Sequence, residues 1–128
     1  MRGESRGILH RLVVQASGGV VCAGEVTDVF GDGNRAVLSL ERDGEPLEEL
    51  LLLRLRHSLI AVVNRCPHME RPLDDARLRG HVLTCQGHGR SYSLRTGRAP
   101  GTLAADCAPA LRRLPAWAED GQVFIRLA

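Results

Sequence analysis

Two short segments of this chain each hold one cysteine followed closely by one histidine, and they constrain its fold more than any other feature. The first is Cys66-Pro67-His68 and the second, after sixteen further residues, is Cys85-Gln86-Gly87-His88. A lone Cys or His is usually an ordinary core or surface residue. Two thiolates and two imidazoles in similarly built segments instead indicate a metal centre, for which the fold has to bring two separate loops together.

The residues beside these side chains suit tight loops. Pro67 fixes one backbone torsion and removes a hydrogen-bond donor, so the Cys and His on either side of it can point to one side of a stiff loop. Gly87 and Gly89 flank His88 and allow a close approach of the backbone and torsions that other residues avoid. Both segments are therefore predicted to be ligand loops.

Two kinds of metal centre fit two Cys and two His. A [2Fe-2S] cluster of the Rieske type takes both thiolates on one iron and both imidazoles on the other. A tetrahedral zinc ion accepts the same set, but common zinc modules place Cys beside Cys and His beside His, whereas each loop here carries one of each. The pairing favours the cluster and leaves a zinc-stabilised binding module as the alternative.

The sequence around both loops resembles the Rieske ferredoxin family. Val63-Asn64-Arg65-Cys66-Pro67-His68 resembles the approach to the family's first ligand box, and His81-Val82-Leu83-Thr84-Cys85 resembles the strand that leads into the second. The strand and turn that leave the second box correspond to residues 88–97. The resemblance covers residues 59–101 well and residues 121–127 more loosely, whereas residues 1–48 carry no such signature.

This resemblance implies an all-β fold: a Rieske-like antiparallel β-sandwich with a small cluster-binding subdomain of two ligand loops. We expect one domain over residues 1–128, with the subdomain at about 64–101. A third loop, Ala99-Pro100-Gly101, would cover the cluster. The implied ligands are Cys66 and Cys85 on the buried iron and His68 and His88 on the outer iron. The residues implied around them are Pro67, Gly87, Gly89, Tyr92 and Pro100.

Five positions refine the resemblance. Respiratory members carry one more Cys in each box, where this chain has Arg71 and Gly87, so it resembles the soluble branch of lower potential. Glu70 stands where the family usually has Gly, and Arg90 replaces a bulky aromatic residue. Tyr92 occupies the place of a Tyr whose hydroxyl reaches a cysteine sulfur in respiratory members. That contact and simple filling of the core are both open interpretations of Tyr92.

The function implied is that of an electron carrier with one Rieske-type [2Fe-2S] cluster and no catalytic residues of its own. Its donor would be a flavin-dependent reductase, and its acceptor an oxygenase or another redox enzyme. A second hypothesis is a small subunit of a multi-subunit oxidoreductase such as a nitrite reductase. A chain of 128 residues leaves no room for the large mononuclear-iron domain of a Rieske oxygenase, so we expect no enzyme activity of its own.

Charge and hydropathy exclude two further classes of function. The chain has seventeen Arg, no Lys and a net charge of +2, and these arginines are mixed with acids, so no nucleic-acid interface is expected. Either an acidic patch on a redox partner or plain solvent can face the arginines near the ligands, which are Arg65, Arg71, Arg77, Arg79 and Arg90. No long apolar run is present, and we expect a cytoplasmic protein. There, Cys22 and Cys107 would be free thiols rather than a disulfide.

Short apolar segments separated by turn residues predict strands. They cover residues 8–14, 20–23, 26–30, 36–40, 59–63, 81–85, 91–94 and 122–127. A hairpin turn is expected at Asp43-Gly44, a turn before the final strand at Asp120-Gly121, and a simple turn at Asp74-Asp75. His10 and His57 are expected on a strand or the surface. Residues 46–56 have helical spacing of leucines after a proline, but the family resemblance favours a strand paired with 59–63, and we predict the strand.

Overall fold

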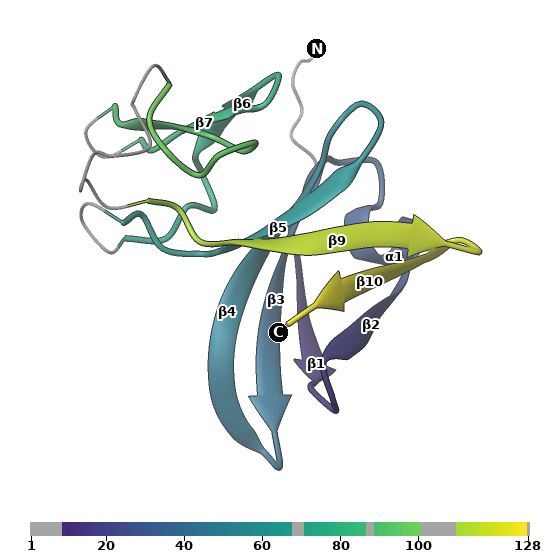
Figure 1. Cartoon of the computed structure of the whole chain (residues 1–128). Helices are drawn as coiled ribbons and strands as arrows, with labels where there is room; N and C mark the ends of the chain where they lie inside the picture. The colour runs from purple at the N-terminus through teal and green to yellow at the C-terminus, as the bar shows by residue number, and fades with distance from the viewer. Residues whose placement is uncertain (1–8, 68–70, 87–88, 101–109, 128) are drawn as a thin grey trace.

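The computed structural model describes residues 9–67, 71–86, 89–100 and 110–127. In these ranges the chain forms a seven-stranded sheet, a three-stranded sheet and one short helix (Figure 1). The elements are β1 (His10–Gln15), β2 (Val20–Glu25), α1 (Val26–Phe30), β3 (Arg35–Arg42), β4 (Glu45–Arg54), β5 (Leu59–Val63), β6 (Arg77–Arg79), β7 (Val82–Thr84), β8 (Ser91–Ser93), β9 (Arg113–Glu119) and β10 (Gln122–Arg126). The predicted all-β class is confirmed.

The large sheet is strongly curled. Its strand order is β1-β3-β4-β5-β9-β10-β2, and the two edge strands, β1 and β2, also contact each other, so the sheet nearly closes into a barrel. All its pairs are antiparallel except β1 with β3. A parallel pair needs a crossover connection, which β2 and α1 supply here. The small sheet, β6-β7-β8, lies at one end of the large one (Figure 1).

The run from Leu50 to Leu53 shows how one strand, β4, contributes to two cores. All four leucines are at most 1% exposed. Side chains alternate between the two faces of a strand, so Leu50 and Leu52 enter the core inside the curled sheet, while Leu51 and Leu53 enter a second core on its other face. The predicted strand over residues 46–56 and its turn to residues 59–63 are therefore confirmed.

The second core connects the large sheet to the small one. From the large sheet it receives Val37, Leu51, Leu53 and Val62, and from the segments around the small sheet it receives Leu73, Leu83, Leu94 and Leu111. Burying one such side chain stabilises the fold by about 1.5–3 kcal/mol. This shared apolar layer fixes the small sheet against the large one.

The prediction of a strand at residues 26–30 is wrong, because this segment forms α1. Val26, Val29 and Phe30 are spaced as on one face of a helical turn, and the last two are buried in the first core. The intervening Thr27 and Asp28 are exposed. The apolar spacing of a five-residue segment fits either a strand or a helical turn. The need to cover one end of the curled sheet favours the helix.

The turn predictions at Asp43-Gly44 and Asp120-Gly121 are confirmed. All four residues have positive φ, between 53° and 81°. Residues of this kind adopt the left-handed conformation of tight hairpins at little cost. No helix in the described ranges is long and apolar enough to cross a membrane.

Candidate metal centre

The two cysteines of the sequence motif lie in one buried cluster. Cys66 follows β5 and Cys85 follows β7, and their exposed fractions are 0% and 1%. Both belong to the second core, together with Leu83 and Tyr92. Segments separated by nineteen positions in the sequence thus bring their thiols to the same apolar layer between the sheets.

The two loops begin with the same hydrogen bond. The backbone N–H of Cys66 donates to the carbonyl of Arg71 at 2.7 Å, and the N–H of Cys85 donates to the carbonyl of Arg90 at 2.8 Å. In each loop the acceptor lies five residues after the cysteine. In the second loop Gly89 has a φ of +72° and donates its own N–H to the Cys85 carbonyl at 3.0 Å. The prediction of two similarly built loops with a glycine torsion is confirmed for these residues.

The predicted histidine ligands, His68 and His88, lie outside the described residues, as do Gly87 and Glu70. Of the other residues predicted near the centre, Pro67 is half-buried, whereas Gly89, Arg90 and Pro100 are exposed. In the described part of the chain no three Cys, His, Asp or Glu side chains converge on one point. Of the four predicted ligands, the described residues include Cys66 and Cys85.

Tyr92 combines both of its predicted roles. It is 4% exposed in the second core, and its hydroxyl lies 3.8 Å from the Cys66 sulfur, within hydrogen-bonding range for sulfur. Burial, the hydrogen bond with Cys66 and the charges of Cys66 and Cys85 raise the pKa of Tyr92 to about 12, against a smaller lowering by Arg90. Both cysteines and the Arg90 guanidinium therefore act on this one hydroxyl.

This pKa predicts a loss of stability at high pH. The chain has one Tyr and no Lys, so the ultraviolet absorbance of tyrosinate reports Tyr92 alone. Since the folded-state pKa lies above the ordinary value of about 10, the folded state retains the proton, and stability falls as pH rises from 10 to 12. We expect a fall of up to about 2–3 kcal/mol that the Tyr92→Phe variant does not show. A tyrosinate midpoint near pH 10 in the folded protein would contradict this.

Two features of the site fit a cluster with cysteine ligands. A Rieske-type [2Fe-2S] cluster takes both thiolates on one iron, and Cys66 and Cys85 are both buried in the same core. The Tyr92 hydroxyl also lies within hydrogen-bonding range of the Cys66 sulfur. The sequence matches the model of the Rieske [2Fe-2S] domain over residues 13–117. The chain belongs to the Rieske [2Fe-2S] domain family. Its cofactor is accordingly a Rieske-type [2Fe-2S] cluster, as predicted.

Solved structures share this fold. A chain in the reduced complex between oxygenase and ferredoxin in carbazole 1,9a-dioxygenase has a TM-score of 0.66 and 23% identity, over 85% of this Rieske chain and 28% of that chain. A chain in a complex of reduced oxygenase and oxidized ferredoxin of the same dioxygenase has a TM-score of 0.65 and 20% identity, over 86% of this chain and 94% of that one.

A third structure, Pseudomonas putida CBB5 NdmA with caffeine, has a TM-score of 0.53 and 25% identity, over 63% of this chain and 25% of that one. This Rieske chain therefore corresponds to about a quarter of the longer chains. No curated protein sequence matches it significantly. These structures show that the chain shares the fold of the matched chains.

Proposed function

We propose that this chain is a one-electron carrier whose cluster is held by Cys66, His68, Cys85 and His88. The observation that carries this proposal is the burial of both cysteines in one core, at the start of two loops closed in the same way. Each histidine follows its cysteine by two or three residues, within the reach of the same loop. We also propose that residues 1–128 form a single Rieske domain, with residues 64–101 as its cluster-binding subdomain.

When bound, such a cluster takes up and releases one electron at a potential of about −150 to +300 mV. The residues of the chain supply its surroundings. Cys66 and Cys85 supply buried thiolates, the leucines of the second core exclude water, and the Tyr92 hydroxyl donates toward the Cys66 sulfur. A donor at a ligand sulfur stabilises the extra negative charge of the reduced state, so Tyr92 raises the potential.

We further propose an oxygenase or another redox enzyme as the acceptor and a flavin-dependent reductase as the donor. The oxygenase and ferredoxin complexes among the structural matches support the first of these. The charge around the small sheet indicates the charge that a partner's docking surface should carry. Residues 76–105, which include the small sheet, hold five Arg and no Asp or Glu and so have a net charge of +5. Since the whole chain has a net charge of +2, the rest of it has a net charge of −3.

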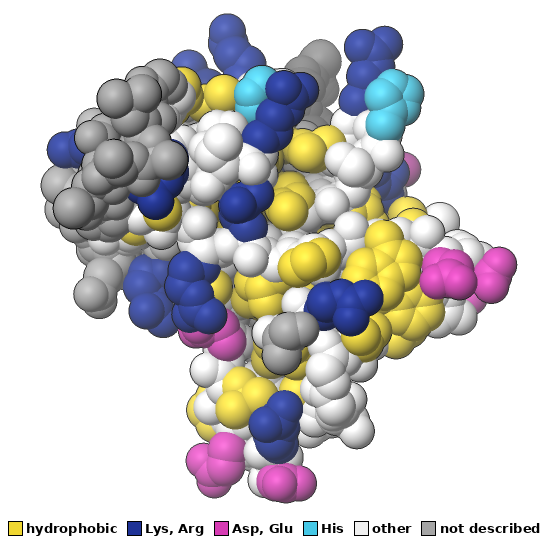
Figure 2. All heavy atoms as spheres, in the orientation of Figure 1, with side chains coloured by type: hydrophobic (Ala, Val, Ile, Leu, Met, Phe, Trp, Pro, Cys, Tyr) yellow, Lys and Arg dark blue, Asp and Glu magenta, His cyan; other side chains and the backbone are white. Residues whose placement is uncertain are grey.

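The basic side chains of this segment are accessible. Arg77, Arg79, Arg90 and Arg95 are exposed, and none of them has a carboxylate partner among the described residues. Figure 2 shows Arg side chains around the small-sheet end, whereas most Asp and Glu side chains on this face lie at the opposite tips. An acidic surface on the redox partner would be drawn to this end and oriented by it.

An anaerobic redox titration with metal analysis tests the proposed function. We expect two irons and two acid-labile sulfides per chain, and one electron taken up reversibly for each pair of irons within about −150 to +300 mV. Protein purified without metal in the medium and reconstituted with iron and sulfide is the control for adventitious iron. Stoichiometric zinc without sulfide would overturn the proposal in favour of a zinc-stabilised module.

A further inference from the structure

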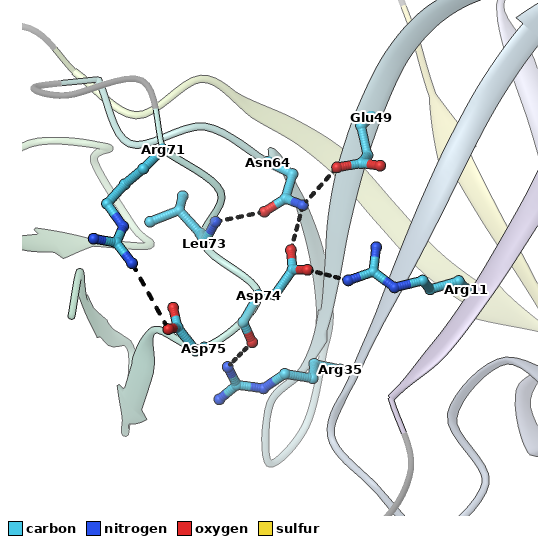
Figure 3. A network of polar contacts seen from close by, with 8 residues as sticks. All are labelled: Arg11, Arg35, Glu49, Asn64, Arg71, Leu73, Asp74 and Asp75. Atoms are coloured by element: carbon cyan, nitrogen blue, oxygen red, sulfur yellow. Dashed lines mark hydrogen bonds and ion pairs between the residues drawn. The ribbon is translucent and has the colours of Figure 1, made fainter. Parts of the chain in front are cut away.

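A buried polar side chain lies two residues before the first proposed ligand. Asn64 is 6% exposed, and Figure 3 shows its amide between the loop segment 71–76 and the strands of the large sheet. Its backbone N–H donates to the Glu49 carbonyl of β4 at 2.9 Å. Buried polar groups of this kind are costly unless all their hydrogen bonds are made, so the contacts of the Asn64 side chain are informative.

The orientation of the Asn64 amide is fixed by its neighbours. The backbone N–H of Leu73 can only donate, and it lies 2.8 Å from Asn64 Oδ1. The Nδ2 group therefore faces two acceptors, Glu49 Oε1 at 3.0 Å and Asp74 Oδ1 at 2.5 Å. One amide thus accepts from the loop backbone and donates to two carboxylates, a pattern that no other neutral side chain of this size provides.

These contacts tie together both ends of the first ligand loop. Asn64 precedes Cys66, and Leu73 follows Arg71, whose carbonyl accepts the N–H of Cys66. The hydrogen bond from the Leu73 N–H to Asn64 Oδ1 closes the same loop a second time, because residues 64 and 73 flank the bonded pair Cys66 and Arg71. The position of Cys66 is therefore set by two nested hydrogen bonds.

Asp74 fixes the same segment to the large sheet. Its carboxylate forms an ion pair with Arg11 of β1 (Figure 3). Arg35 of β3 donates to the Asp74 carbonyl at 2.9 Å and to the Ala76 carbonyl at 2.6 Å. Hydrogen bonds with a charged partner are about twice as strong as neutral ones. Strands β1 and β3 thus hold the segment that follows the loop, while β4 holds Asn64 before the loop.

We propose that Asn64 is a positioning residue for the first ligand loop, and that Asp74 is the acceptor that keeps its amide in place. This inference rests on the proposed function, because the loop it positions is the one that presents Cys66 and His68 to the cluster. Asn64 acts through hydrogen-bond polarity: the loop backbone needs an acceptor, and the carboxylates of Glu49 and Asp74 need a donor. Apolar packing alone satisfies neither.

Three variants test this polarity. Asn64→Ala removes both functions without a charge, and Asn64→Asp keeps size and acceptor but turns the donor into a third carboxylate. The double variant Asn64→Asp with Asp74→Asn restores a donor opposite residue 64 and the original net charge, and the half-exposed Glu49 can turn to solvent. We expect both single variants to release the cluster to a chelator at least about tenfold faster than wild type. Their midpoint potentials should also shift, and the double variant should return most of both properties.

Each outcome has a distinct meaning. If wild-type protein contains no iron and sulfide, the proposed function itself is wrong. If wild type holds the cluster but Asn64→Asp has the same release rate and potential, size alone is sufficient and the inference is wrong. If the double variant recovers nothing over Asn64→Asp, the partnership with Asp74 is wrong. If Asn64→Asp does not fold, Asn64→Ala carries the test, and an unchanged release rate and potential there overturn the inference.

Discussion

Protein carrying Cys85→Ser is expected to be purified without colour and with almost no acid-labile sulfide, against two irons and two sulfides per wild-type chain. Cys85 is one of the two proposed cysteine ligands and is buried, and a serine hydroxyl is a far weaker ligand for iron because it does not ionise at neutral pH. Iron and sulfide analysis of the purified protein measures the effect directly. Cys66→Ser should give the same result, since both thiols lie in one core.

Cys22→Ser is the matched control for this experiment. Cys22 is an exposed free thiol on β2, where its sulfur lies 3.0 Å from Gln122 Oε1 of β10. The same chemical change there should leave the iron and sulfide content unchanged. Full sulfide content in the Cys85→Ser protein would show that Cys85 is not a ligand.

A folded but clusterless Cys85→Ser protein separates ligation from folding. The second core is built mainly from leucines of both sheets, so it does not depend on one sulfur atom. A buried hydroxyl without a partner costs about 1–3 kcal/mol, which is less than the stability of a typical domain. The same analysis on His68→Ala and His88→Ala tests the two proposed ligands that lie outside the described residues.

The sequence was most informative where a single local pattern decides the structure. Pairs such as Asp43-Gly44 predicted a hairpin because their positive φ is a property of the residues themselves. The strand at residues 46–56 was harder to predict, because leucines at helical spacing after a proline also fit a helix. Only the presence of a core on each face of the sheet, which is a property of the whole fold, makes a strand the better solution.

The elements that sequence reasoning missed depend on long-range partners. Strand β9 contains Pro115, which removes a backbone donor and argues against a central strand, yet it pairs with both β5 and β10. Strand β6 has three residues and carries no signal apart from Leu78 between two arginines. The segment 26–30 is too short for its apolar spacing to distinguish a strand from a helical turn.

The same limit applies to the site. The two cysteines and their loops could be predicted from the sequence, because the two motifs are alike and their cysteines are only nineteen positions apart. The contacts of Asn64 and Asp74 could not, because they join the loop to strands up to 63 positions away, as in the pair of Arg11 with Asp74. Asp74 was expected to belong to a simple turn. It does form one, and its carboxylate contacts became evident only from the packing of the loop on the sheet.

Reversing two charges on β6 is expected to change the rate at which anionic and cationic oxidants reach the reduced cluster, in opposite directions. Arg77 and Arg79 are two positions apart on a strand, so they share its exposed face, while Leu78 packs toward the second core. We expect the double variant Arg77→Glu with Arg79→Glu to react about tenfold more slowly with hexacyanoferrate(III) at low salt and faster with a cationic cobalt(III) complex. Stopped-flow loss of the reduced spectrum measures both rates.

The ratio of the two rates separates surface charge from a change in the cluster. An altered potential would shift both oxidants in the same direction, whereas a charge effect shifts them in opposite directions and disappears near 1 M salt, where the screening length is about 3 Å. Arg42→Glu, at the exposed end of β3 on the far hairpin, is the control for Arg79→Glu, because it makes the same change of net charge away from the small sheet. Equal effects of these two single variants would mean that only net charge matters, and the proposed docking of an acidic partner at the small sheet would then be wrong.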